Sequence, residues 1–407
     1  MATTSPLSRA IRDFAVVGGG IAGCTVAYEL ARRGHSVTLY EQSSIAHAAS
    51  GRNMGLLLNQ VEVEVVKIMR HSLEIYREVE HAARPFNLRQ LPQLLLARDA
   101  EQMKVARAHA AALREIGVEA QPLDPQQVRS EVPQLSEDIQ GGYLLPGAWA
   151  LDPAPATQAF AEAARVAGAE IRTGARVSAI DRHGVFTDEG RRPAGGVIVA
   201  SGPWAVDLLP SLPVTAARGW VLLTAALPFA LPWIVEEMSW PDQDRLGRAS
   251  RLPTLADVAS GGHDEPAASA LALAPLTDGR ALIGTSMAPS LREAVEGLDM
   301  PQRVAARALE IAPGLRDVSI ARAWYGMRPM APDGMPIVGR LGESGVFVHG
   351  GHGSLGMMTA PATARWLVDE ILGETRPELK SLSPARFAES ASSAPSRLSS
   401  GGTAPAP

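Results

Sequence analysis

A glycine-rich segment near the N-terminus has the residue types and spacing of a phosphate-binding turn. Gly18, Gly20 and Gly23 follow the apolar run 14–17, and Glu41 ends the next apolar run. In such a turn the first glycine permits the tight bend, the second lets the backbone approach a pyrophosphate, and the third lets helix and strand pack closely. The start of the following helix offers free amides and the positive end of its dipole to the phosphates. We therefore expect a dinucleotide site here.

The acid at position 41 indicates which dinucleotide the site accepts. The Glu41 carboxylate can accept hydrogen bonds from the ribose hydroxyls, and it disfavours a 2′-phosphate. The alternative is an ordinary glycine turn without a ligand. A strand, a helix with Gly34 at its exit, and a terminal acid in one register favour the dinucleotide site.

Hydrophobic periodicity predicts the elements that position this turn. The first unit is a strand, turn, helix and strand at 14–17, 18–23, 24–33 and 36–40. Amphipathic helices are predicted at 62–83 and 100–116. A helix from Pro153 leads into strands at 169–172, 176–181 and 196–201. This alternation predicts that all three strands join the sheet of the first unit.

The region 214–325 has a different character. Its apolar runs are interrupted by prolines, and Asp278-Gly279 predicts a hairpin turn between strands 271–275 and 281–285. A mostly antiparallel sheet is therefore expected. The chain then returns to a strand at 346–349, a glycine-rich loop and a helix that ends near Gly373.

The predicted fold class is α/β combined with α+β, with a Rossmann-like nucleotide-binding domain interleaved with an antiparallel one. The nucleotide-binding domain comprises 13–85, 145–213 and 326–375, and the substrate-binding domain comprises 86–144 and 214–325. Residues 1–12 form a polar lead. The Ser, Ala, Pro and Gly composition of 386–407 predicts a disordered tail.

Composition excludes several classes of protein. The net charge is −5, and the 38 basic residues form no run, so a nucleic-acid partner is not expected. The single cysteine, Cys24, excludes an intrachain disulfide and multi-cysteine metal sites, and no metal is predicted. It also fits a reducing compartment, so we expect a cytoplasmic protein. No run reaches the roughly 18 apolar residues of a membrane span.

Three further segments carry a family resemblance: 49–55 (ASGRNMG), 200–205 (ASGPWA), and 324–339 (WYGMRPMAPDGMPIVG) leading to 350–357 (GGHGSLGM). Together with the first turn, they resemble the D-amino-acid oxidase, glycine oxidase and sarcosine oxidase family of FAD-dependent oxidoreductases. The resemblance extends from Ala15 to about Gly373. Four motifs in the same order make it specific for the family, though not for the substrate.

The resemblance implies FAD as the cofactor, and we expect it to be bound non-covalently. Segment 49–55 is expected along the flavin ring, and the turn 200–202 over the adenosine-pyrophosphate half. The residues expected to bind FAD are Gly18, Gly20, Ile21, Ala22, Gly23, Glu41, Gln42, Ser50, Gly51, Arg52, Asn53, Met54, Gly55, Val177, Ser201, Gly202, Trp204, Arg328, Gly351, His352, Gly353, Ser354, Leu355, Gly356 and Met357.

The second glycine loop also supports a ligand on physical grounds. Its glycines free the backbone to approach a ligand, and the following helix, with Pro361 in its first turn, directs its positive end the same way. The amides of Ser354, Leu355 and Gly356 are expected to stabilise negative charge on the reduced flavin, as an oxyanion hole does. A flexible loop without a ligand is the alternative.

The resemblance also suggests residues for substrate binding and catalysis. The arginine of the family's Gly-x-Arg-Pro segment, here Arg328, pairs with the substrate carboxylate, and a planar guanidinium suits that bidentate contact. Tyr325, His352 and Arg52 are the further catalytic candidates. The alternatives are a structural ion pair for each arginine, and packing for the tyrosine and the histidine.

Two features of the sequence bear on a covalent flavin, which is the alternative, and on the electron acceptor. In the dimethylglycine and sarcosine dehydrogenase branch, the histidine of a His-Ala-Ala-Gly segment bonds covalently to the flavin. His47 lies in a similar segment that has Ser50 in place of the glycine. The chain's three lysines, Lys67, Lys104 and Lys380, lie outside 214–325. That region therefore offers no lysine to activate oxygen, so the acceptor is oxygen with another cation nearby, or a different molecule.

The predicted reaction is oxidation of the C–N bond of a small amino acid or N-methyl amino acid. Hydride passes to flavin N5, and the resulting imine hydrolyses. One alternative is an FAD-dependent 2-hydroxy-acid dehydrogenase. Another is the FAD subunit of a heteromeric sarcosine-, opine- or glycine-oxidising complex, so a partner subunit or a homo-oligomer is also considered. An NAD-dependent dehydrogenase is a further alternative, but it gives the second glycine loop no role.

Overall fold

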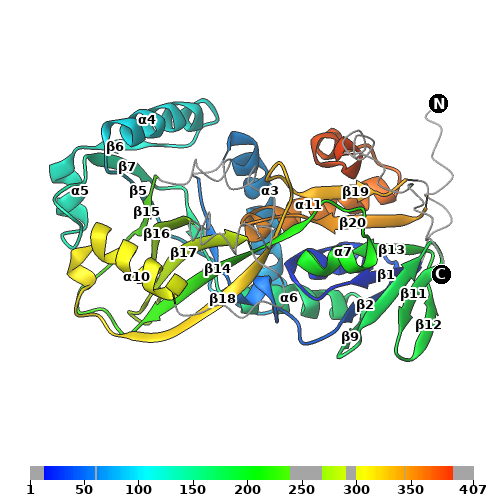
Figure 1. Cartoon of the computed structure of the whole chain (residues 1–407). Helices are drawn as coiled ribbons and strands as arrows, with labels where there is room; N and C mark the ends of the chain where they lie inside the picture. Colours follow the sequence, from blue (N-terminus) through cyan, green and yellow to red (C-terminus); the bar gives the residue numbers. More distant parts are fainter. Residues whose placement is uncertain (1–12, 60–61, 239–267, 290–298, 343, 388–407) are drawn as a thin grey trace, which may run out of the picture.

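The computed structural model describes residues 13–59, 62–238, 268–289, 299–342 and 344–387. Figure 1 shows two parts side by side, a six-stranded sheet with its helices on the right and an eight-stranded sheet on the left. The predicted lead 1–12 and residues 388–407 of the predicted tail lie outside the described residues. Arg386 and Phe387, which were also assigned to the tail, belong to the short 3-10 helix Pro384–Phe387.

The six-stranded sheet has the order β19-β20-β13-β1-β2-β9. All its neighbouring pairs are parallel except β19 with β20. Its strands are β1 (Asp13–Val17), β2 (Ser36–Glu41), β9 (Glu170–Thr173), β13 (Gly196–Val199), β19 (Ile337–Arg340) and β20 (Val346–Gly350). Parallel strands with crossover helices are the arrangement that the alternating pattern predicted.

Four helices form the layer beside this sheet. They are α1 (Ile21–Ala31), α3 (Val63–Ala82), α6 (Pro153–Val166) and α11 (Gly356–Ile371). Helix α1 packs against α6 and α11, and α11 packs against α3. The apolar residues of α3 recur at helical spacing and are buried, whereas the intervening charged residues face solvent. Helix α1 starts at Ile21, three residues before the predicted start, so Gly23 lies inside it.

The eight-stranded sheet has the order β18-β14-β17-β16-β15-β5-β7-β6. All its pairs are antiparallel except β15 with β5. Its strands are β5 (Gln93–Ala97), β6 (Gln121–Leu123), β7 (Gly141–Leu145), β14 (Thr215–Thr224), β15 (Ile234–Glu237), β16 (Ala268–Pro275), β17 (Ala281–Pro289) and β18 (Ile320–Met330). The predicted hairpin is confirmed as β16 and β17, with Gly279 at a φ of 83° in the turn.

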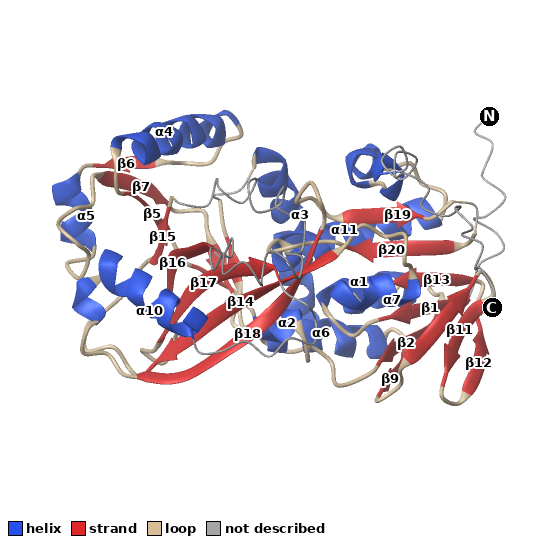
Figure 2. Ribbon diagram, viewed as in Figure 1, coloured by secondary structure: helices blue, strands red, loops and turns tan. Residues whose placement is uncertain are grey.

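Helices cover the outer side and the far end of this sheet, as Figure 2 shows. Helix α10 (Asp299–Ile311) packs against β14, β16 and β17. Helices α4 (Ala100–Glu115) and α5 (Pro125–Glu131) lie beside β7, and α4 also contacts β5. The opposite face of the sheet is therefore left to line the space between the two parts.

Two small sheets and several short helices complete the fold. One sheet is β10 (Val177–Asp181), β11 (Gly184–Thr187) and β12 (Gly190–Pro193), and the other is β3 (Leu56–Leu57), β8 (Trp149–Ala150) and β4 (Arg89–Gln90). The short helices include α2 (Ala49–Arg52), α7 (Ala205–Leu208) and the 3-10 turns Gly202–Trp204, Pro313–Leu315 and Pro377–Leu382. The prediction that strand 176–181 joins the first sheet was wrong. It pairs instead with β11, the next strand along the chain, in a local hairpin.

Two of the predicted domain limits fall inside strands. The limit between 325 and 326 lies within β18, which pairs with β14 from Ile320 to Met330. Leu145, assigned to the nucleotide-binding domain, pairs with Gln93 in the eight-stranded sheet. Strand β18 therefore extends from the eight-stranded sheet into the glycine loop region, where Met330 forms a bridge with His352.

Helix α11 contains a proline whose lost hydrogen bond is replaced from α3. Pro361 is the sixth residue of α11, so its predicted place in the first turn was wrong. It cannot donate to the Met357 carbonyl, which instead accepts the Tyr76 hydroxyl at 2.8 Å. The next amide, that of Ala362, donates to Ser72 Oγ at 3.1 Å. Two polar side chains of α3 therefore keep the start of α11 in place.

We expect Tyr76→Phe to lower the free energy of unfolding by about 1–3 kcal/mol, because the buried Met357 carbonyl loses its donor. Thermal unfolding of the FAD-bound protein measures this change. Tyr143→Phe is the matched control, since Tyr143 is also buried and its hydroxyl makes no hydrogen bond to a described residue. Equal melting temperatures for the two variants would contradict the role of the Tyr76 hydroxyl.

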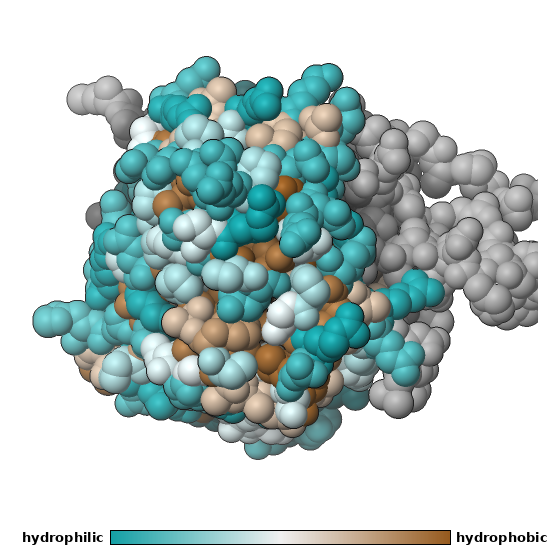
Figure 3. Space-filling model, turned by 90° about the vertical axis from the view of Figure 1, so that its left-hand side faces the viewer, coloured by the Kyte–Doolittle hydropathy of each residue, from teal (hydrophilic) through white to brown (hydrophobic). Residues whose placement is uncertain are grey.

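The face of the molecule in Figure 3 is mainly hydrophilic, with apolar side chains scattered among polar ones. Among the described residues, no helix combines the length and the apolar character needed to cross a membrane.

Candidate functional site

A cleft of about 900 Å³ lies between the two sheets. It brings together the first glycine turn, the segment around α2, the turn after β13, the end of β18 and the loop before α11. Of the predicted site residues, those that line it are Gly18, Gly20, Ile21, Ala22, Glu41, Gln42, His47, Ser50, Arg52, Asn53, Met54, Gly55, Val177, Ser201, Gly202, Trp204, Tyr325, Arg328, His352, Gly353, Ser354, Leu355, Gly356 and Met357.

Three of the predicted cofactor residues do not line the cleft but act as packing glycines. A Cβ on Gly23 would lie 1.9 Å from the Gly18 carbonyl oxygen, and one on Gly51 would lie 2.1 Å from that of Ala46. Gly351 has a φ of 65° and packs against the Ile337 side chain. These positions shape the walls of the cleft, because a side chain there would collide with the structure behind.

The first glycine turn is tightly fixed. Gly18 has a φ of 116°, and its amide donates to the Tyr40 carbonyl at 2.8 Å. A Cβ on Gly20 would lie 3.0 Å from Ser50 Oγ, and that hydroxyl accepts the Ile21 amide at 2.9 Å. The segment around α2 is therefore joined directly to the start of α1, so both sides of this end of the cleft are held together.

Glu41 stands at the mouth of the same turn. Its Oε2 accepts the Gly19 amide at 2.6 Å, and its Oε1 accepts the Ser43 amide at 2.8 Å. Each carboxylate oxygen has further lone pairs, so these contacts orient the group without exhausting it. The structure thus explains how the carboxylate is held in the cleft wall, where a ribose is expected.

The loop before α11 has both bound and free amides. The Leu355 amide donates to the His352 carbonyl at 2.8 Å, so in this structure it is already engaged. Within the described residues, no acceptor takes the amides of Ser354 and Gly356, and both residues line the cleft. The N-terminal end of α11 contributes its positive dipole there. Two of the three predicted amides therefore remain available for an anionic ligand.

Some buried polar atoms in the cleft have no hydrogen-bond partner among the described residues, as expected for a cofactor site. His352 is 3% exposed, its Nδ1 bonds with Thr359 Oγ1 at 2.9 Å, and its Nε2 has no partner among the described residues. The hydroxyl of Ser201 is also buried without such a partner. An FAD carries many acceptor and donor groups, so these residues and the glycine-lined walls fit it.

Two histidines, His349 at the end of β20 and His352 in the loop that follows, are neutral at neutral pH. The rings of His349 and His352 meet edge to face, with centroids 4.8 Å apart. Burial lowers the pKa of His349 to about 4. Burial and the neighbouring His349 lower the pKa of His352 well below its usual value. His352 can thus serve as a hydrogen-bonding group, but not as a cation.

Arg328 presents a guanidinium without a carboxylate partner among the described residues. Its Nη1 donates to the Ser286 carbonyl at 2.9 Å and its Nη2 to Thr285 Oγ1 at 2.8 Å. Burial lowers the pKa of Arg328 to about 10, so the group remains charged at neutral pH. An oriented, uncompensated cation in a cleft is suited to an anionic ligand such as a carboxylate.

Gly219 provides the space that Arg328 occupies. A Cβ on Gly219 would lie 2.0 Å from Arg328 Nη1. We therefore expect Gly219→Ala to displace the guanidinium and raise KM by about 10- to 100-fold, comparable to the loss of one charged hydrogen bond. Steady-state kinetics measures the change. FAD content provides the control, and an unchanged KM would show that the guanidinium position does not matter.

Tyr325 and Arg52 complete this end of the cleft. The Tyr325 ring lies 4.6 Å from the guanidinium carbon of Arg218 and 5.1 Å from the centroid of Trp220. Arg52 Nε donates to the His47 carbonyl at 2.9 Å, and Nη1 donates to the Tyr325 carbonyl at 3.4 Å. The backbone contacts of Arg52 link α2 to β18. They favour a positioning role over the surface ion pair considered as an alternative.

Sequence reasoning missed several residues of the cleft. Gly219, Glu236, Ala272 and Thr285 come from the eight-stranded sheet, in a region where no motif was recognised. One signal was available: Glu236 and Glu237 follow two apolar residues in a strand that reads as buried. Adjacent acids in such a strand are unusual and point to specific partners.

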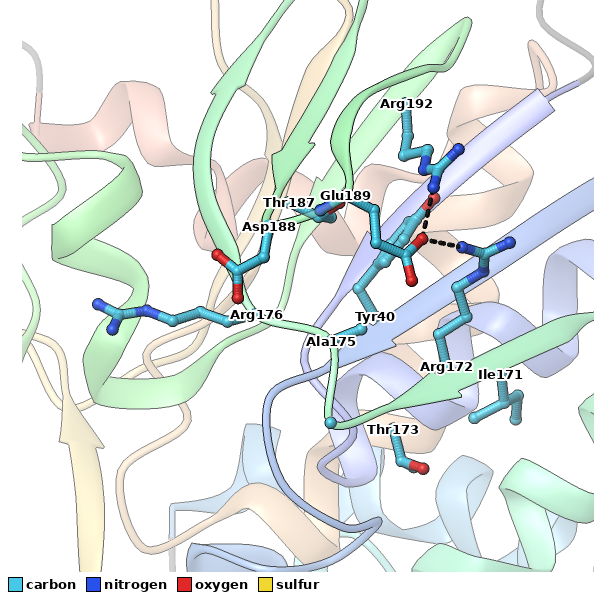
Figure 4. A pocket seen from close by; sticks show the side chains of 11 residues that line it. Tyr40, Ile171, Arg172, Thr173, Ala175, Arg176, Thr187, Asp188, Glu189 and Arg192 are labelled. Carbon is cyan, nitrogen blue, oxygen red and sulfur yellow. Dashed lines mark hydrogen bonds and ion pairs between the residues drawn. The ribbon is translucent and has the colours of Figure 1, made fainter.

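A second hollow, of about 670 Å³, lies beside β9 and the β10–β12 sheet (Figure 4). Glu189 reaches Arg172 at 3.1 Å and also contacts Arg192, so these two arginines share an acidic partner. The other charged residues of its lining, Arg176 and Asp188, are exposed to solvent. Among the described residues, no group of three or more His, Cys, Asp or Glu side chains could hold a metal ion.

Comparisons with known proteins agree with these features. A D-amino acid dehydrogenase of Cereibacter sphaeroides is 26% identical over 436 residues, covering 90% of this chain and 93% of that protein. A glycine oxidase of Geobacillus kaustophilus is 26% identical over 377 residues, covering 88% and 92%. The bifunctional protein ThiO/ThiG of Synechocystis sp. is 29% identical over 273 residues, covering 65% of this chain but 37% of that protein.

The fold is also shared with solved structures. The crystal structure of glycine oxidase from Geobacillus kaustophilus superimposes with a TM-score of 0.79 at 24% identity, covering 92% of this chain and 98% of that one. The family model DAO, described as FAD dependent oxidoreductase, matches residues 13–370. The match spans both sheets and the whole cleft, and the protein therefore belongs to the DAO family of FAD-dependent oxidoreductases.

Proposed function

We propose that the protein oxidises the C–N bond of a small amino acid or N-methyl amino acid. The observation that carries this proposal is the guanidinium of Arg328, charged and without a carboxylate partner in the described part of the chain, in the cleft that fits FAD. The relatives named glycine oxidase and D-amino acid dehydrogenase support the same substrate class. Substrates with a carboxylate and an adjacent amine fit both observations.

Different residues of the cleft would bind the cofactor and the substrate. Gly18, Gly20 and the start of α1 would hold the pyrophosphate, and the free amides of Ser354 and Gly356 would donate to the flavin. When bound, FAD accepts the hydride that leaves the carbon next to nitrogen. Arg328 holds the carboxylate and so fixes the orientation of that carbon. The cleft thereby positions the reactants, and the substrate ammonium must lose a proton before the hydride can leave.

A 2-hydroxy acid would use the same carboxylate anchor, so the experiment compares matched pairs. Turnover is measured with glycine and glycolate, and with D- and L-alanine and the two lactates. We expect 2-oxo acid and ammonia from an amino acid, with the hydroxy acids at least 100-fold slower in kcat/KM. Faster turnover of the hydroxy acids would reject the proposal in favour of a hydroxy-acid dehydrogenase.

We also make proposals on the flavin attachment, the electron acceptor, the cellular location and the assembly of the protein. We propose non-covalent FAD: although His47 lines the cleft, Ser50 replaces the expected glycine of its segment. Lys67, Lys104 and Lys380 are exposed, and none of them lines the cleft, so the acceptor is oxygen activated by another cation or a different molecule. A cytoplasmic location is supported by the single, buried cysteine. A homo-oligomer or a partner subunit is compatible with this proposal.

A further inference from the structure

Strand β15 carries two adjacent buried carboxyl groups with contrasting surroundings. Glu236 and Glu237 are 4% and 1% exposed. Successive side chains of a strand point to opposite faces. Glu237 lies on the side of α10, where Arg307 Nε donates to it at 3.0 Å and Arg98 Nη1 lies 3.7 Å away. Glu236 lies on the side of the cleft.

Among the described residues, the hydrogen-bond partner of Glu236 is neutral and no cation is paired with it. Gln93 Nε2 donates to its Oε2 at 2.7 Å, and Gln93 Oε1 accepts the Asn59 amide at 3.2 Å. The Asn59 carbonyl in turn bonds with His109 Nε2 at 2.8 Å. These contacts hold the carboxyl group in place without balancing its charge. A buried carboxylate without a cation is costly, so the group is suited to a cationic ligand.

The register of the sheet places Glu236 on the face that carries the substrate anchor. Glu236 pairs with Ala272 on β16, and Ala272 pairs with Gly284 on β17. Directly paired residues point to the same face, and a Cβ on Gly284 would lie 2.6 Å from Met54 Sδ, in the cleft. Thr285, which holds Arg328, is the next residue of β17, and it lines the same cleft as Glu236 and Ala272. Two strand spacings separate β15 from β17, about 10 Å, a span that a small amino acid with a hydrogen bond at each end can bridge.

We infer that Glu236 is a second substrate-binding residue, whose carboxylate receives the substrate ammonium group while Arg328 holds the substrate carboxylate. This inference rests on the proposed function. The ammonium transfers one proton to Glu236, giving a neutral amine and a protonated carboxyl group, before the hydride leaves. The proton remains on Glu236 until product is released. This step is balanced without any further reactant.

The titration of Glu236 supports this role. Burial raises its pKa to about 8, and the hydrogen bond from Gln93 opposes the rise. Its paired neighbours in the sheet, Leu95 and Ala272, and its hydrogen-bond partner Gln93 are uncharged, and the charged groups that also line the cleft include Arg328 and Arg52. A carboxyl group with a raised pKa is ionised only above that pKa, so the ammonium-binding form predominates above pH 8. The wild-type kcat/KM should therefore fall about tenfold per pH unit below pH 8.

The test compares wild type with Glu236→Gln in the FAD-bound protein. Glutamine keeps an oxygen for Gln93 and removes a buried ionisable group, so the variant should fold. For its best substrate among glycine, N-methylglycine and alanine, kcat/KM should fall at least 100-fold at pH 8.5. In a plot of kcat/KM against pH, the fall on the acid side (the acid limb), which lies at pH 8 in wild type, should move in the variant to the pKa of the substrate amine. Competitive inhibition by acetate or propionate, which lack the amine, should change less than threefold.

Glu310→Gln is the matched control, since it makes the same chemical change on α10, outside the cleft. It should leave both kcat/KM for the amine substrate and the inhibition constant of acetate unchanged. The inference is overturned if Glu236→Gln, with wild-type melting temperature and FAD content, keeps the acid limb and the amine substrate's kcat/KM. It is also overturned if acetate inhibition weakens as much as amine turnover. If wild type itself prefers hydroxy acids, the proposed function fails instead, so the two failures are distinguishable.

Discussion

Replacing Arg328 with alanine is expected to weaken substrate affinity by on the order of 100- to 1,000-fold and to leave FAD content unchanged. A planar guanidinium can give a carboxylate two parallel charged hydrogen bonds. Each is worth about 1.5–3 kcal/mol, and about 1.4 kcal/mol corresponds to a factor of ten in affinity. Thr285 and Ser286 already orient the group, so little is lost in ordering it. KM and the apparent dissociation constant in anaerobic flavin reduction report the effect.

Two comparisons make this prediction specific. Arg328→Lys keeps a charge but not the planar fork, so its affinity should lie between those of wild type and the alanine variant. Arg322→Ala removes an exposed arginine of the same strand, which lies over the Trp324 ring, and should leave affinity unchanged. If Arg328→Ala binds substrate as tightly as Arg322→Ala does, the carboxylate is held elsewhere.

Gly23→Ala is expected to yield a protein that retains almost no FAD and is destabilised by about 3 kcal/mol or more. The new Cβ would lie 1.9 Å from the Gly18 carbonyl oxygen, and neither atom can move unless the backbone that carries it moves. Relieving this contact requires α1 to shift away from β1, which opens the phosphate turn. Flavin retained per chain after purification and thermal unfolding of the apoprotein measure the two effects.

Gly20→Ala separates cofactor binding from folding. Its Cβ would meet the Ser50 side chain at 3.0 Å and no backbone atom within 4 Å, so the apoprotein should unfold close to the wild-type temperature. FAD affinity should still fall, by at least about tenfold, because the methyl group fills the place where the backbone approaches the pyrophosphate. Wild-type FAD affinity in both variants would show that this turn does not bind the phosphates.

The features that depend on a few consecutive residues could be predicted from the sequence. The first glycine turn, the hairpin at Gly279 and the loop at Gly353 follow from backbone positions that require glycine. Arg328 followed from the family motif, and the alternating pattern gave the parallel sheet. In each case the signal lies within a few consecutive residues.

The features of the fold and the cleft that the sequence did not reveal depend on contacts between segments far apart in the chain. The two hydrogen bonds that accommodate Pro361, from the Tyr76 hydroxyl and to the Ser72 hydroxyl, join residues almost 300 positions apart, and no local pattern reveals them. The strand 176–181 joined a local hairpin because its neighbour in the chain offered a closer partner than the main sheet. Thr285 and Glu236 enter the cleft only through the register of the eight-stranded sheet, which periodicity does not specify.

The most direct test of the account is the visible spectrum of the purified protein, before and after acid precipitation and during anaerobic addition of amino acids, N-methylglycine among them. The account predicts a yellow protein whose colour is released into the acid supernatant and bleached by an amino acid or N-methyl amino acid. Yellow that stays in the pellet would point to a covalent bond at His47. A colourless protein that cannot be reconstituted with FAD, or a flavin that no amine reduces, would contradict the account.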